Sequence, residues 1–146
     1  MAQLTSTNMT AVRSVGRQAV GSLSFELIAA FALCVTAGVH IADVSGKLEE
    51  TTYIGLLFIL GPIATAMLAA VLLVGPNPLV GWLLGAGVSA ATAAGYILSR
   101  TTGLPNARDD IGNWGEPIGV LSLLSEGAVL LCLVAAAMRG GARESA

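Results

Sequence analysis

Four long apolar windows, separated by short polar stretches, dominate the pattern of the chain. They cover residues 22–42, 53–74, 79–98 and 118–138. A bilayer core about 30 Å thick needs roughly 20 apolar residues in a helix to cross it. Hydrocarbon offers backbone groups no other partner, and no window alternates with a period of two, so the spans must be helices. The pattern predicts an all-α membrane four-helix bundle.

The breaks between the windows agree with this division. Residues 75–78 read Gly-Pro-Asn-Pro, a very short turn that predicts a tight antiparallel hairpin of the second and third spans. Glu116-Pro117 favours a helix start, because proline suits the first turn and an acid suits the positive end of the helix dipole. Gly61-Pro62 lies inside the second window and predicts a kink there.

The chain therefore divides into a polar, weakly amphipathic segment at 1–21, a four-span domain at 22–138 and a polar tail at 139–146. We expect segment 1–21 on the membrane surface or without fixed structure. Four crossings place both termini on one side, with Arg13, Arg17, Arg139 and Arg143. The other side holds Lys47, Arg100 and Arg108. The positive-inside rule favours cytoplasmic termini.

Composition supports a membrane protein and excludes other classes. Of 146 residues, 55% are hydrophobic and 11% are charged, whereas soluble domains carry about 25% charged residues. The net charge is −2, and the chain has neither a basic block nor a GxxxxGK[ST] phosphate loop. The lipid bilayer is thus the expected partner, and nucleic acid is not one.

Three ionisable residues interrupt the apolar windows. Glu26 and His40 lie in the first span and Glu126 lies in the fourth. A carboxylate near the bilayer centre must be protonated, paired or beside water, and it marks a functional site by default. Glu126 follows Pro117 by nine residues, so it lies roughly 13 Å below the outer boundary.

Polar residues gather at the end of the bundle opposite the termini. The central candidates are His40, Arg100, Glu116 and Glu126, and Glu26 is a further candidate. The sequence also predicts an acidic outer face in the two loops there, comprising Asp43, Glu49, Glu50, Asp109 and Asp110. A long stretch, residues 99–117, links the third and fourth spans, and long loops are often functional.

Two interpretations of this cluster stay open. In the first it is a polar network in which Arg100 neutralises Glu116 or Glu126. In the second it is a proton or cation site facing outward. Because the chain has one histidine and no HExxH, we predict no metal site. We also predict no catalytic residues, because there is no GxSxG.

The third span carries small residues at four-residue spacing, namely Gly81, Gly85, Ser89 and Ala93. Such a stripe lets another helix approach closely and predicts a helix–helix seam. The partner helix could belong to the same chain or to a second copy.

One resemblance extends over most of the chain after Ser22. The motifs are SRTTGLP at residues 99–105, EPIG at 116–119 and SLLSE at 122–126. In these motifs the chain resembles a group of small four-span bacterial membrane proteins without an assigned biochemical function. The resemblance implies a multi-pass protein of the bacterial inner membrane, but no reaction and no cofactor.

The sequence leaves three functions open. The first is a non-enzymatic membrane component that associates with itself or with a larger membrane complex, motivated by the small-residue stripe. The second is a proton-coupled or cation-linked small transporter that uses Glu126, assisted by His40 and Arg100. The third is a quinone-binding membrane oxidoreductase subunit. The cofactor is unknown.

Overall fold

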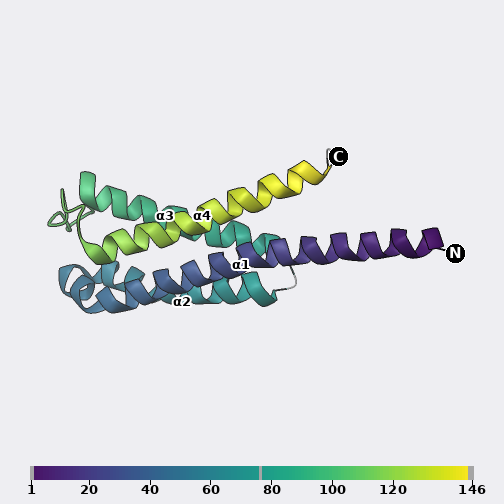
Figure 1. The fold of residues 1–146 in the computed structure, drawn as a ribbon. Coiled ribbons are helices and arrows are strands. Elements are labelled where there is room, and N and C mark those ends of the chain that lie inside the picture. Colours follow the sequence, from purple (N-terminus) through teal and green to yellow (C-terminus); the bar gives the residue numbers. More distant parts are fainter. Residues whose placement is uncertain (1, 76, 145–146) are drawn as a thin grey trace.

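A computed structural model describes the backbone of residues 2–75 and 77–144, and the side chains of residues 23–75, 77 and 79–139. These residues form four helices, α1 (Ala2–Glu50), α2 (Thr52–Val74), α3 (Pro78–Thr101) and α4 (Pro117–Glu144). All four contain segments long and apolar enough to cross a membrane. The all-α membrane four-helix fold predicted from the sequence is therefore confirmed. The N-terminal end of α1 and the C-terminal end of α4 lie at the same end of the bundle (Figure 1).

The helix starts and turns follow the predicted signals. Asn77 caps α3 by accepting a hydrogen bond from the Leu79 amide at 3.1 Å. Pro117 opens α4, and the Glu116 carbonyl accepts the Val120 amide at 2.9 Å. α2 runs through Pro62, and the Thr65 hydroxyl donates to the Gly61 and Pro62 carbonyls.

The first and last helices extend beyond their predicted ends. α1 continues to Glu50, so the expected first loop shrinks to Thr51. Asp43, Glu49 and Glu50 thus lie on a helix, and placing them in a loop was wrong. No proline interrupts this stretch, and a Lys47–Glu50 ion pair one turn apart supports it. Residues 2–21 are part of α1 and residues 139–144 are part of α4, so the alternative that segment 1–21 lacks fixed structure was wrong.

The packed core lies in the half of the bundle nearer the α2–α3 turn. It joins α1, α2, α3 and α4 through Ala29, Ala30, Ala32, Leu33, Ala69, Leu72, Trp82, Val129 and Cys132. Alanines dominate it, so the helices approach closely at this level. In the opposite half, toward the loop between α3 and α4, polar side chains lie inside the bundle.

The small-residue stripe of α3 is used inside the chain. Gly81, Gly85 and Ser89 are buried, and Ala93 is partly buried. A Cβ on Gly81 would lie 2.9 Å from the Leu72 Cα on α2, and one on Gly85 would lie 3.6 Å from a Leu33 methyl on α1. The predicted seam therefore joins helices of one chain at these positions.

Candidate functional site

The loop between α3 and α4 folds over the end of the bundle opposite the two termini (Figure 1), and we call residues 102–116 the cap. Three residues with positive φ shape it, Gly103, Asn106 and Gly112. A short bridge pairs Leu104 with Ala107, whose side chain is buried. The Gly112 amide donates to the Arg100 carbonyl at 2.9 Å, which returns the chain to the end of α3. The cap is thus a folded element with its own backbone bonds.

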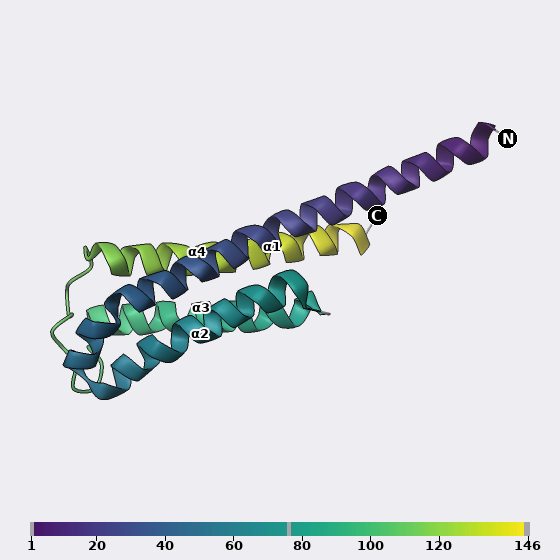
Figure 2. The same cartoon turned by 90° about the horizontal axis from the view of Figure 1, so that it is seen from below.

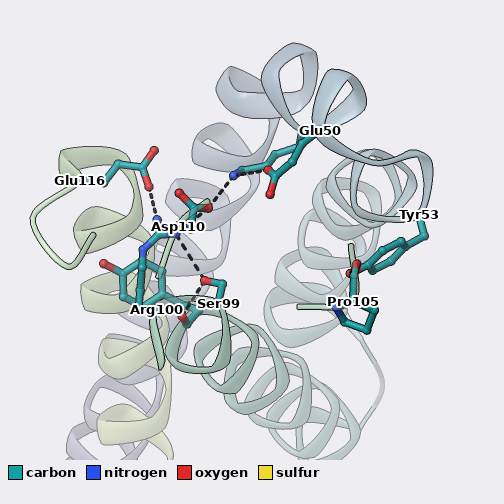
Figure 3. A network of polar contacts seen from close by, with 9 residues as sticks. Glu50, Tyr53, Ser99, Arg100, Pro105, Asp110 and Glu116 are labelled. Carbon is teal, nitrogen blue, oxygen red and sulfur yellow. Dashed lines mark hydrogen bonds and ion pairs between the residues drawn. The ribbon is translucent and has the colours of Figure 1, made fainter. Parts of the chain in front are cut away.

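Charged side chains fasten the cap to two helices, α1 and α3 (Figure 3). One oxygen of Asp110 accepts from Lys47 Nζ at 2.9 Å and pairs with Arg100 Nη1 at 2.6 Å. Arg100 Nη2 also binds Glu116, and Lys47 binds Glu50 at 2.8 Å. Arg100 is buried, with 4% of the residue exposed, whereas its partners Asp110 and Glu116 are partly exposed. The predicted Arg100–Glu116 contact is present, because Arg100 ends α3 and Glu116 precedes α4.

Aromatic side chains add further links between the cap and the bundle. The Tyr53 hydroxyl donates to the Pro105 carbonyl at 2.8 Å, and the Tyr96 hydroxyl donates to the Trp114 carbonyl at 3.1 Å. The Tyr96 ring lies under the Arg100 guanidinium, 4.8 Å from its centre. A Cβ on Gly119 would collide with this ring, so only glycine leaves Tyr96 in place.

We predict that acid weakens the attachment of the cap, because the pKa of Asp110 is lowered in the folded protein. Burial raises the pKa of Asp110, but hydrogen bonds from Lys47 and Arg100 outweigh burial and hold the pKa below its ordinary value. A carboxyl with a lowered folded-state pKa stabilises the fold fully above its unfolded pKa, about 3.9. That contribution is lost as pH falls through the folded-state pKa. We expect Asp110→Asn to be less stable than wild type at pH 7, with the difference shrinking below about pH 4.

Unfolding by sodium dodecyl sulfate in mixed micelles would measure this difference across pH. Asp109→Asn is the matched control, because Asp109 is the exposed neighbour and no ion pair involves it among the described residues. A gap between Asp110→Asn and wild type of equal size at pH 7 and pH 3 would contradict the interpretation.

Beneath the cap, a cavity of about 480 Å³ occupies the outer half of the bundle. All four helices and the cap line it, with apolar walls that include Val39, Ile54, Phe58, Val88 and Ile118. This volume lies within the range of small-molecule sites, roughly 300–1,000 Å³. The cavity was not predicted from the sequence, because its walls are ordinary apolar span residues.

Polar side chains of α1 and α4 form the floor of the cavity, where His40, Ser122 and Glu126 line it and Thr36 and Ser125 contact each other behind them. The Thr36 and Ser125 hydroxyls lie 2.7 Å apart, and Ser125 donates to the Ser122 carbonyl at 2.8 Å. His40 Nδ1 donates to the Thr36 carbonyl at 2.8 Å, which leaves Nε2 as the second ring nitrogen. The His40 ring also packs on Phe58, with centroids 4.7 Å apart.

Glu126 is the buried acid of this floor. Its side chain lines the cavity and is only 1% exposed. Oε1 accepts from the Ser122 hydroxyl at 2.8 Å, while Oε2 has no hydrogen-bond partner. The Thr92 hydroxyl of α3 is a further hydrogen-bonding neighbour of the carboxyl, although it also lies within hydrogen-bond distance of the Val88 and Ser89 carbonyls, and His40 of α1 acts on the carboxyl electrostatically. Glu126 therefore has one oxygen available to a cation, a proton or a ligand.

The structure separates the predicted cluster into two groups. Arg100, Glu116, Asp110 and Glu50 form the clamp of the cap, and none of the described ion pairs joins Arg100 to Glu126. His40 and Glu126 belong to the cavity floor, and Asp43 lines the cavity as well. Glu26, Glu49 and Asp109 do not line it. Within the described residues, no three His, Cys, Asp or Glu side chains lie close enough to share a metal ion.

Fold and site together define a small membrane bundle with a capped internal cavity and one incompletely bonded acid. No family model, curated protein or solved structure matches the chain.

Proposed function

We propose that this protein is a cation-linked membrane transporter in which Glu126 binds a proton and a cation in alternation. The observation that supports it best is the unpartnered Oε2 of a carboxyl that is 1% exposed and lines a cavity. A purely structural acid at this depth should be paired with a base, because an unpaired charge there is costly. The two cations that line the cavity, Arg100 and Lys47, are instead bound to other acids, and the Nδ1 of His40 donates to the Thr36 carbonyl.

The other proposals have less support. Self-association was motivated by Gly81, Gly85 and Ser89, which are buried within this chain and need no second copy. For quinone binding, the cavity offers volume, but its acidic lining favours a positive ligand over a neutral one. We also propose cytoplasmic termini in a bacterial inner membrane, supported by Arg13, Arg17, Arg139 and Arg143 at the terminal end.

Infrared spectroscopy of the purified protein in nanodiscs tests the proposal without a known substrate. We expect a protonated-carboxyl C=O band that disappears as the sample is titrated to alkaline pH. The band should be missing from Glu126→Gln, because the amide does not titrate.

Glu49→Gln is the matched control, because Glu49 is exposed and lies outside the cavity. Its spectrum should keep the band. If Glu126→Gln and wild type give the same titration difference spectra, Glu126 exchanges no proton and the proposed function is wrong.

A further inference from the structure

The cavity opens sideways at exposed residues of α2 and α3. Three residues that line it, Leu57 and Leu60 on α2 and Ala91 on α3, are also exposed, the two leucines by about 60%. α2 and α3 converge at their shared turn and separate toward the end that carries the cap (Figure 1). Figure 2, seen from below, shows the same ends apart. The exposed lining residues Leu57, Leu60 and Ala91 mark the side entrance of the cavity.

This entrance lies at the depth of the acyl chains. Leu57 and Leu60 follow Thr52, the first residue of α2, by five and eight residues. At 1.5 Å per residue they lie roughly 8–12 Å inside the outer end of the helix. The aqueous end is covered by the cap, whose Leu104, Ala107 and Asp110 line the cavity from above. A ligand that reaches the cavity by this route must first dissolve in the bilayer.

The charge of the lining selects the sign of the ligand. Five acids line the cavity, against two bases and one histidine: Asp43, Glu50, Asp110, Glu116 and Glu126, with Lys47, Arg100 and His40. Both bases are already bound to acids of the cap clamp. Toward Glu126 itself, α1 presents His40, while α2 and α3 contribute apolar residues and the Thr92 hydroxyl to the wall. An apolar cation is therefore the ligand that this lining stabilises.

We propose that the cavity binds a lipophilic organic cation, which enters from the bilayer between α2 and α3 and lies with its positive charge at Glu126. This inference rests on the proposed function and names its substrate class. On binding, the protonated Glu126 carboxyl loses its proton to water, and the resulting carboxylate pairs with the cation. The apolar body of the ligand occupies the walls formed by α2 and α3.

Binding of tetraphenylphosphonium to the protein in nanodiscs tests the ligand class. We expect saturable binding with release of a proton, measured with a pH-indicator dye, and a loss of affinity of about thirtyfold or more in Glu126→Gln. Neutral decylubiquinone and the hydrophilic cation tetramethylammonium should not compete. Equal affinity for wild type and Glu126→Gln, or displacement by decylubiquinone, would overturn the proposal.

The entrance is tested by a matched pair of substitutions on α3. Ala91 lines the opening, whereas its neighbour Ala90 is exposed and does not line the cavity. We expect Ala91→Trp to slow association of tetraphenylphosphonium by about tenfold or more in stopped flow, and Ala90→Trp to leave it unchanged. Equal association rates for the two variants would show that the ligand does not enter between α2 and α3.

The infrared and binding experiments distinguish a wrong ligand class from a wrong proposed function. If the Glu126 carboxyl titrates in the infrared spectrum but tetraphenylphosphonium does not bind, the ligand class is wrong and the proposed function survives. If the carboxyl does not titrate, both are wrong.

Discussion

Replacing Arg100 by methionine should lower the free energy of unfolding by about 3 kcal/mol, the low end for breaking a buried ion pair. Arg100 is 4% exposed and pairs with two acids, Asp110 and Glu116. These acids are 20% and 28% exposed, so water would replace part of the interaction with Arg100 that they lose. Methionine keeps much of the apolar part of the arginine side chain, so the loss of stability measures the contribution of the guanidinium charge. Unfolding by sodium dodecyl sulfate in mixed micelles would measure it.

Arg108→Met is the control for this experiment, because Arg108 is an exposed cap residue outside the described ion pairs. It should change stability by less than about 0.5 kcal/mol. A double-mutant cycle with Glu116→Gln should recover part of the Arg100→Met loss, since the second change removes an acid left without its base. If Arg100→Met is as mild as Arg108→Met, the clamp does not hold the cap.

The spans were predictable because each rests on local chemistry. Apolar windows of sufficient length must form helices in hydrocarbon, and Pro117 and Asn77 mark helix starts by their own backbone geometry. The Arg100–Glu116 contact was predictable for a similar reason, since one residue ends a helix and the other precedes the next. These features depend on sequence neighbours or on the order of the spans.

The rest of the site depends on the path of the cap and on the tilt of the helices. Asp110 reaches Arg100 and Lys47 because Gly103, Asn106 and Gly112 turn the chain with positive φ. Sequence alone marks these as turn residues but does not fix where the turn leads. No residue pattern marks the cavity either, because its walls are ordinary apolar residues contributed by all four helices.

The first interpretation of the cluster, a polar network around Arg100, describes only part of the site. A polar network does neutralise Arg100, but its acids are Asp110 and Glu116 rather than Glu126. The clamp therefore closes the aqueous end without using the acid at the floor. The bases of the clamp are thus occupied by other acids, and the Glu126 carboxyl keeps an oxygen without a hydrogen bond among the described residues.

Replacing Glu126 by methionine should stabilise the protein while it removes cation binding. The carboxyl is buried with Oε2 unpartnered, and an unsatisfied buried polar group costs about 1–3 kcal/mol. Methionine has a similar length and fits irregular apolar space. Ser122, which now donates to Glu126, can donate to the carbonyl four residues earlier on its own helix. We expect a gain of about 1–2 kcal/mol in the free energy of unfolding by dodecyl sulfate.

Ser125→Ala is the opposing control one residue away. Ser125 is buried, and its hydroxyl contacts both Thr36 and the Ser122 carbonyl, so its loss should cost about 1 kcal/mol. If Glu126→Met is less stable than wild type, as expected for Ser125→Ala, then Glu126 stabilises the fold and is not a ligand-binding residue. A gain in stability together with loss of tetraphenylphosphonium binding is expected of a binding site whose buried carboxyl lowers the free energy of unfolding. Because the two outcomes have opposite signs, a single unfolding series separates a structural acid from a functional one.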